Sequence, residues 1–261
     1  MRKPIVGLSQ KIYNNTREHE EVYLHELKEK IDALSIENID LFYFPSLGVL
    51  ETTSAILKDH CLKFGAQNIA PIFKGAMTGE YSLETLIDIG GRYVEVGHAE
   101  RKRFLLESSQ LIRDKLVLTL RNGLTPVLCI GEESRLEIED RKKFYKEELS
   151  FLLGNLDRRT VKNIVIAYEP VWAIGQEEAA ETNYIYSSHH AIRNVLKELF
   201  GEMVSQEVRI IYGGSVSKEN APAIVENESV DGVFIGRFGH NPSNFAMIID
   251  IVNQIKNEEE I

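Results

Sequence analysis

The chain has 261 residues, of which 43% are hydrophobic and 27% are charged, and its formal net charge is −10. A chain of this size and composition buries one sizeable core, so we expect a single domain over residues 1–261. The acidic balance excludes a nucleic-acid groove or an anionic membrane surface, because the overall field repels polyanions. An anionic small-molecule substrate therefore requires a local positive site.

The sequence carries no sign of export or membrane insertion. Its two cysteines, Cys61 and Cys129, lie far apart and lack metal-ligand spacing, which is typical of a reducing compartment rather than of a disulfide framework. The apolar run from Ile5 to Leu8 is too short for the core of a signal peptide, and no apolar stretch reaches the length of a membrane span. We therefore expect a cytoplasmic protein.

Short apolar, β-favouring runs alternate with helical patterns along the chain. Thr16 is a predicted N-cap, and after it Leu24, Leu27 and Ile31 recur at helical spacing. Later helical patterns end at glycine residues or run to the carboxyl terminus. The eight predicted strands are residues 5–9, 41–44, 68–70, 93–97, 126–130, 163–168, 208–212 and 232–235.

The repeating pattern predicts a closed barrel. Strands that are apolar along nearly their whole length are covered on both faces, as in a parallel sheet with crossover helices. Eight units in 261 residues give roughly 30 residues each, the size of one unit in a (β/α)₈ barrel. The rival, a doubly wound open sheet, usually has a glycine-rich turn after its first strand, where this chain has Gln10 and Lys11.

Polar residues follow several predicted strands. Lys11 follows the first strand, His98 the fourth and Glu169 the sixth, and glycine-rich turns follow the seventh and eighth. Each residue alone is more often an ordinary surface or structural group. The carboxyl ends of barrel strands share one face, however, so together these residues supply a base, an electrophile and a cradle for an anion.

Five segments, in order along the chain, resemble signature segments of the triosephosphate isomerase family. They are residues 75–80 (GAMTGE), 97–101 (GHAER), 129–132 (CIGE), 167–175 (AYEPVWAIG) and 212–216 (YGGSV).

The resemblance implies an isomerase of glycolysis and gluconeogenesis that acts on a small phosphorylated sugar without cofactor or metal. It would interconvert dihydroxyacetone phosphate and D-glyceraldehyde 3-phosphate through an enediolate. Glu169 would carry the proton between two carbons, and His98 would act on the substrate oxygens. Lys11 would supply positive charge beside them, held by Glu100.

The same resemblance assigns residues 170–180 to a lid that excludes water from the enediolate. Trp172 lies in its first hinge, and Tyr212 is among the supporting residues. The implied phosphate donors are the backbone N–H groups of Gly175, Ser215, Gly236 and Arg237.

A loop from Gln67 to Glu80 resembles the loop that, in this family, inserts into a second copy of the chain. It would bring Thr78 beside the active site of the partner. We therefore expect a homodimer.

Several positions depart from the family pattern. Ser9 stands where the family has Asn, Ala99 replaces the Ser after the histidine, and Arg237 replaces a glycine. The lid tip contains Glu177 and Glu178 where the family has small neutral residues. Because Ser9 shortens a polar contact and Arg237 adds one, a four-carbon tetrulose phosphate, such as erythrulose phosphate, is an alternative to the triose as substrate.

Two further alternatives remain at this stage. Other barrels that bind sugar phosphates form a Schiff base through a lysine at a strand end, and Lys11 has that position. A barrel that binds a sugar phosphate without catalysis is the other reading. Against it, all three central side chains are present in the sequence.

Overall fold

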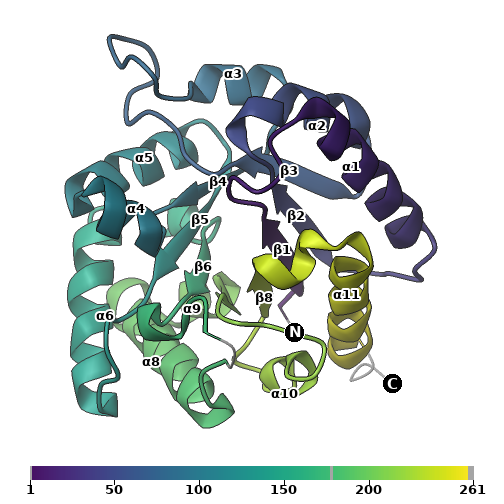
Figure 1. The fold of residues 1–261 in the computed structure, drawn as a ribbon. Coiled ribbons are helices and arrows are strands. Elements are labelled where there is room, and N and C mark those ends of the chain that lie inside the picture. The colour runs from purple at the N-terminus through teal and green to yellow at the C-terminus, as the bar shows by residue number, and fades with distance from the viewer. Residues whose placement is uncertain (1, 177–178, 258–261) are drawn as a thin grey trace.

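The computed structural model describes residues 2–176 and 179–257. Eight strands form a closed barrel in chain order, and each pair of neighbours is parallel (Figure 1). The (β/α)₈ barrel predicted from the sequence is therefore confirmed. The strands are β1 (Ile5–Ser9), β2 (Asp40–Phe44), β3 (Leu62–Ala66), β4 (Tyr93–Val96), β5 (Thr125–Ile130), β6 (Val165–Tyr168), β7 (Arg209–Tyr212) and β8 (Gly232–Ile235).

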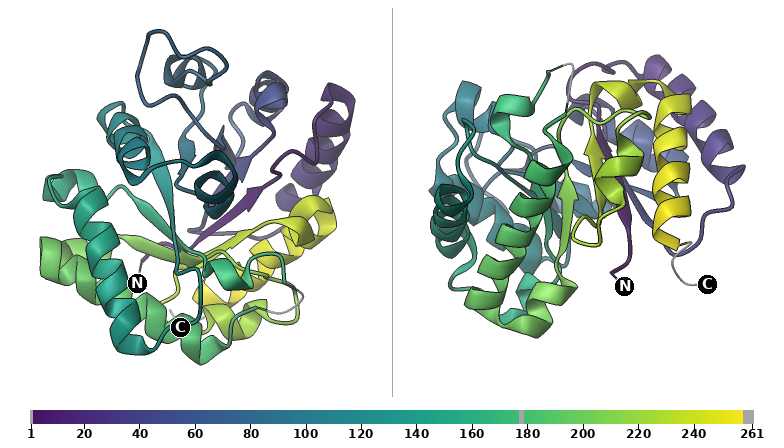
Figure 2. Two further views of the ribbon diagram at one scale, coloured as in Figure 1. Left: turned by 60° about the vertical axis from the view of Figure 1, so that its left-hand side comes forward. Right: turned by 90° about the horizontal axis from the view of Figure 1, so that it is seen from below.

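The helices form an outer layer around the strands, as the two turned views in Figure 2 show. None of the helices in the described ranges is long and apolar enough to cross a membrane. The α-helices are α1 (Arg17–Asp32), α2 (Leu50–Leu57), α3 (Leu83–Asp88), α4 (Ala99–Leu105), α5 (Ser109–Arg121), α6 (Ile138–Leu153), α7 (Arg158–Val161), α8 (Thr182–Phe200), α9 (Glu202–Glu207), α10 (Ala221–Val225) and α11 (Pro242–Asn257). Short 3₁₀ turns are η1 (Leu47–Val49), η2 (Val171–Ala173) and η3 (Arg237–His240).

Helix α1 shows how the sequence specifies this outer layer. Thr16 caps it, since the Thr16 hydroxyl accepts a hydrogen bond of 3.2 Å from the His19 backbone N–H, an interaction worth about 1 kcal/mol. Leu24, Leu27 and Ile31 lie on one face and are buried. Each such side chain contributes about 1.5–3 kcal/mol through removal from water, so this face fixes the helix against the barrel.

The third strand was predicted at residues 68–70, and this was wrong because β3 covers Leu62–Ala66. Lys63 and Gly65 interrupt its apolar run. Lys63 is exposed and donates a hydrogen bond of 2.8 Å to the His60 carbonyl. At position 65 a Cβ atom would lie 2.0 Å from the Tyr93 carbonyl oxygen, so only glycine allows this close approach.

The interior of the barrel is filled by side chains rather than open. The ring centroid of Phe42 lies 5.3 Å from that of Phe44, 5.1 Å from that of Tyr93 and 5.4 Å from that of Phe234. Cys129 is buried in the same cluster, as expected for a structural thiol. This packed interior separates the two ends of the barrel, so they can serve different purposes.

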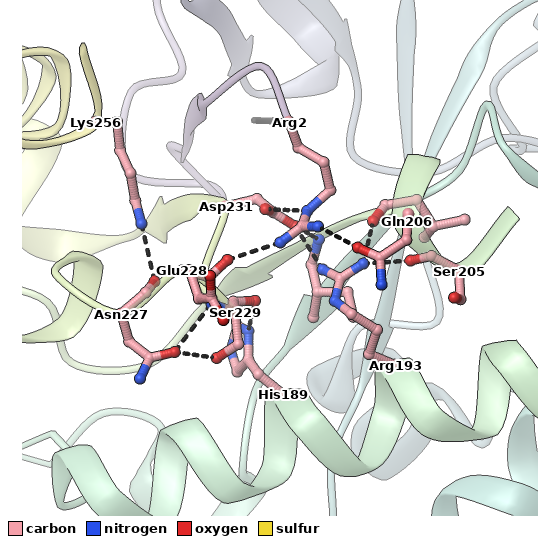
Figure 3. A network of polar contacts seen from close by, with 12 residues as sticks. Arg2, His189, Arg193, Ser205, Gln206, Asn227, Glu228, Ser229, Asp231 and Lys256 are labelled. Atoms are coloured by element: carbon pink, nitrogen blue, oxygen red, sulfur yellow. Dashed lines mark hydrogen bonds and ion pairs between the residues drawn. The ribbon is translucent and has the colours of Figure 1, made fainter. Parts of the chain in front are cut away.

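A polar network joins the amino ends of the strands (Figure 3). Asp231, just before β8, pairs with Arg2 at 2.5 Å and with Arg193 at 2.8 Å. It also accepts a hydrogen bond of 2.7 Å from the Ile210 backbone N–H. Removing one partner from such a buried pair lowers the free energy of unfolding by about 3–5 kcal/mol. The amino end of the barrel therefore contributes to the stability of the fold.

A second buried carboxyl group, that of Glu20 on α1, lies between the helices and β2. It accepts hydrogen bonds from Thr53 at 2.6 Å, Tyr43 at 3.0 Å and Asn14 at 2.5 Å. Burial raises the pKa of Glu20 to about 7, although these hydrogen bonds oppose the change.

The raised pKa of Glu20 predicts a pH dependence of stability. Above pH 4.5 the unfolded chain releases this proton while the folded chain keeps it until about pH 7, so the free energy of unfolding falls as the pH rises across that window. The loss amounts to about 3 kcal/mol, since each pH unit between the two pKa values is worth about 1.4 kcal/mol. Urea unfolding at pH 5 and pH 8 should show a smaller difference for Glu20→Gln than for the wild type, and equal differences would contradict the prediction.

Candidate active site

The carboxyl ends of the strands surround a cavity of about 640 Å³, a size typical of sites for small ligands. Most residues singled out in the sequence line it. They are Ser9, Lys11, His98, Glu100, Glu169, Gly175, Ser215, Gly236 and Arg237.

Glu169 follows β6 and is buried, with 5% exposure. Its backbone N–H donates a hydrogen bond of 2.8 Å to the Ile130 carbonyl, which holds the residue at the cavity floor. Its Oε2 atom is buried without a hydrogen-bond partner among the described residues. Burial, helped by Glu95, holds the pKa of Glu169 well above its usual range, so its carboxylate is a strengthened base. A Cβ atom at Gly213 would lie 2.5 Å from Oε1, which explains the glycine there.

His98 follows β4 and caps helix α4. Its Nδ1 accepts a hydrogen bond of 3.1 Å from the Glu100 backbone N–H, so the proton of the neutral ring lies on Nε2. Nε2 lies 3.5 Å from Glu169 Oε2 and 3.2 Å from Lys11 Nζ. Burial, together with the positive charge of Lys11, lowers the pKa of His98 to about 3. The imidazole is therefore neutral at ordinary pH and presents one N–H to the cavity.

Lys11 has a left-handed backbone with a φ of 50°. This conformation is strained for a lysine, and the Gln67 side chain supports it through a hydrogen bond of 2.7 Å to the Lys11 carbonyl. Lys11 Nζ donates a hydrogen bond of 2.7 Å to Glu100 Oε1. Although burial opposes charge, Glu95 and Glu100 raise the pKa of Lys11, so the side chain is a stable ammonium.

Sequence analysis missed Glu95, on β4. Its side chain is 5% exposed, and its Oε2 accepts a hydrogen bond of 3.1 Å from the Ser9 hydroxyl. Its Oε1 lies 3.9 Å from His98 Nε2. Burial raises the pKa of Glu95 to about 7. One signal was present in the sequence: Glu95 is an acidic residue inside an otherwise apolar strand.

Hydrogen bonds hold the described part of the lid, residues 170–176 and 179–180, over the cavity. The Ala180 backbone N–H donates to the Tyr212 hydroxyl at 3.0 Å, and the Ser215 hydroxyl donates to the Gln176 carbonyl at 2.7 Å. At the first hinge, the Trp172 indole N–H donates to Glu132 at 3.1 Å. These hydrogen bonds thus tie both ends of this segment to neighbouring parts of the barrel.

Arg237 adds a contact between the lid and the end of β8. Its guanidinium donates a hydrogen bond of 2.9 Å to the Gly175 carbonyl, from an exposed position on the rim. The residue that departs from the family pattern thus contacts the lid directly. The acidic lid tip, Glu177 and Glu178, lies outside the described residues.

Thr78 lies on the loop between β3 and α3, which stands out from the barrel in Figure 1. The residue is exposed, and it is not among the described residues that line the cavity. Within one copy of the chain, Thr78 is therefore not part of the cavity wall that the described residues form.

The Arg237 contact predicts an effect on lid closure. A single hydrogen bond of this kind is worth about 1 kcal/mol, so Arg237→Ala should reduce the closed population about fivefold relative to the open one. Trp172 is the only tryptophan of the chain and reports on the hinge. Its fluorescence emission should shift to longer wavelength in Arg237→Ala but not in Arg159→Ala, which removes an exposed arginine from α7. Identical emission spectra would contradict the lid contact.

Comparison with known proteins identifies the family. The family model described as triosephosphate isomerase matches residues 4–252. Probable triosephosphate isomerase 2 of Listeria monocytogenes serotype 4b (strain F2365) is 46% identical over 257 residues, covering 98% of this chain and 100% of the relative. Triosephosphate isomerase of Fusobacterium nucleatum is 34% identical over 258 residues, covering 97% and 100%. The chain therefore belongs to the triosephosphate isomerase family.

Proposed function

We propose that this enzyme interconverts dihydroxyacetone phosphate and D-glyceraldehyde 3-phosphate by proton transfer through an enediolate. The observation that carries the proposal is the meeting of three groups on one cavity floor. His98 Nε2 lies 3.5 Å from Glu169 Oε2 and 3.2 Å from Lys11 Nζ. The names of the relatives favour the triose over the four-carbon ketose phosphate.

Glu169 acts as the base. Its unpaired, buried Oε2 removes a proton from the carbon next to the carbonyl and returns it to the neighbouring carbon. Because burial holds the pKa of Glu169 well above its usual range, the carboxylate is closer in basicity to the weak carbon acid than an exposed glutamate would be. Glu169 must be ionised when the substrate binds, because only the carboxylate can accept the proton.

His98 acts on the two substrate oxygens. A neutral imidazole is a weak acid whose N–H donates to the developing oxyanion and passes the proton between the oxygens. The hydrogen bond from the Glu100 backbone N–H to Nδ1 fixes the required tautomer. A neutral histidine at a helix N-terminus is an established feature of the triosephosphate isomerase family, and the pKa of about 3 here agrees with it.

Lys11 supplies the positive charge for the enediolate and the phosphate. A Schiff-base lysine must lose its proton to attack a carbonyl, whereas the pKa of Lys11 is raised and its ammonium pairs with Glu100. The electrostatic role is therefore favoured, and borohydride should trap no adduct with substrate.

The glycine-rich turns and the lid account for the rest of the site. Gly175, Ser215, Gly236 and Arg237 line one side of the cavity, where their backbone N–H groups are the proposed phosphate donors. The closed lid excludes water, which prevents the enediolate from losing its phosphate. Lid closure in this family is a standard example of such gating.

The base assignment predicts a large kinetic effect. Glu169→Gln removes the proton acceptor, so kcat for dihydroxyacetone phosphate should fall about 10²–10⁴-fold with little change in KM. Substrate carbon should take up deuterium from D₂O with the wild type but not with this variant. Glu169→Gln should unfold no more easily than the wild type, because it removes a buried charge. Absence of both turnover and deuterium uptake in the wild type would favour the non-catalytic binding barrel.

We further propose a cytoplasmic homodimer that forms through the loop from Gln67 to Glu80. This loop exposes apolar side chains, with exposed fractions of 40% for Ile72, 39% for Phe73 and 38% for Met77. Covering them with a second copy removes this surface from water. Gln67 also contacts the Lys11 carbonyl, so docking of the loop would steady a group at the site. Two free, separated cysteines suit the reducing cytoplasm.

If the dimer forms through this loop, a charged side chain placed in the loop should prevent dimer formation. In light scattering the wild type should show twice the chain mass of 29.7 kDa, and Met77→Asp should show the single mass because it would bury an unpaired charge in the interface. Met247→Asp is the matched control, since Met247 is 40% exposed on α11. A monomeric wild type at working concentration would refute the dimer.

A further inference from the structure

Arg135 lies in the loop between β5 and α6, and it is not among the described residues that line the cavity. We propose that Arg135 is a positioning residue that joins the two ends of the lid and thereby slows movement of the lid away from the cavity. This inference deepens the proposed function and rests on it, because the lid protects the enediolate of that same reaction.

One contact of Arg135 is with the first hinge of the lid. The guanidinium carbon lies 4.9 Å from the centroid of the Trp172 ring, within the range of a cation–π interaction. The indole N–H of Trp172 donates a hydrogen bond of 3.1 Å to Glu132, which belongs to the same loop as Arg135. The loop after β5 therefore holds the hinge in two ways, through the indole nitrogen and through the face of the ring.

The other contacts of Arg135 are with the segment where the lid ends and α8 begins. Arg135 Nη2 pairs with Glu181 Oε1 at 3.0 Å, and Glu181 is the residue that directly precedes α8. The guanidinium carbon also lies 5.5 Å from the centroid of the Tyr184 ring, and this ring packs edge-on against Trp172 at 5.3 Å. One guanidinium thus contacts residues that precede and follow the lid tip.

Tyr184 is the fixed side of this arrangement. Its hydroxyl donates a hydrogen bond of 2.9 Å to Glu132. The guanidinium carbon of Arg141, on α6, lies 3.8 Å from the centroid of the Tyr184 ring, and the same guanidinium donates a hydrogen bond of 3.1 Å to the Tyr184 carbonyl. Movement of the Trp172 hinge away from Tyr184 therefore has to break the contact with Arg135.

The strength of these contacts suits a lid that has to open in every turnover. The side chains of Arg135 and Glu181 are 52% and 75% exposed, so solvent and salt screen their attraction. A cation–π contact at an exposed position is also weak. Because one planar guanidinium makes both contacts, they break together, which slows opening without preventing it.

Early movement of the lid has a chemical consequence that can be measured. When the enediolate is no longer protected, its electrons form a carbonyl at one end and a new carbon–carbon double bond at the other, and the phosphate leaves with the electron pair of its C–O bond. The remaining enol moves its hydroxyl proton to carbon and becomes a 2-oxoaldehyde, so no oxidant or other co-reactant is needed. Inorganic phosphate released per isomerisation therefore reports how often the lid opens too early.

The first experiment measures this phosphate fraction with dihydroxyacetone phosphate as substrate. Arg135→Met removes the charge but keeps an unbranched side chain, and it should raise the fraction at least about threefold at low salt, as expected for the loss of two weak contacts. Arg135→Lys should recover part of the difference, because an ammonium can still pair with Glu181. Added salt should raise the fraction more in the wild type than in Arg135→Met.

Arg103→Met is the matched control, since Arg103 makes the same kind of contact with another ring, that of Phe104 on α4, at 5.2 Å. This variant should leave the phosphate fraction unchanged. An equal fraction in the wild type and in Arg135→Met would overturn the proposal, and so would an equal rise in Arg135→Met and Arg103→Met.

A second experiment tests the joining of the two ends without turnover. Trp172 is the only tryptophan of the chain, and Glu181→Gln should shift its fluorescence emission when Arg135 is present but not in Arg135→Met, because Arg135 connects the two residues. Equal shifts in both backgrounds would refute the connection. A wild type inactive on the triose would count against the proposed function instead, and the fluorescence result would still decide whether Arg135 joins the ends of the lid.

Discussion

The site depends on one ammonium group, that of Lys11, placed among three carboxyl groups. Glu95, Glu100 and Glu169 all raise the pKa of Lys11. In return, the ammonium lowers the energetic cost of carboxylates that would otherwise repel each other in a poorly hydrated cavity. Burial lowers the pKa of His98, and the ammonium of Lys11 lowers it further, since a second positive charge beside it is unfavourable. Burial and this one charge together set the ionisation of the proposed base and the proposed electrophile.

Hydrophobic pattern predicted most of this fold, because barrel strands are buried on both faces and read as apolar runs. The pattern did not reveal β3, because this strand contains the exposed Lys63 and also Gly65, which lies too close to Tyr93 for any side chain. Predicted helix boundaries held where a side chain caps the helix, as at Thr16. The helical region after β4 is divided into α4 and α5, and the spacing of apolar residues did not reveal this division.

Residues of the site that follow strands were visible in the sequence, because the topology of a barrel brings strand ends together. Glu95 was not, since it lies within a strand, and only the structure shows that its side chain points into the barrel beside Ser9. The contact of Arg237 with Gly175 was equally hidden, because it joins segments 62 residues apart. Long-range side-chain contacts of this kind depend on packing, which local patterns do not encode.

The network around Asp231 has a consequence for how the chain is made. Arg2 leaves the ribosome before its partners at Gln206, Glu228 and Asp231, which emerge more than 200 residues later. Strand β1 cannot pair with β8 until β8 itself has been synthesised. During translation the growing sheet therefore has an open edge at β1, and the final strand closes it in a single late step.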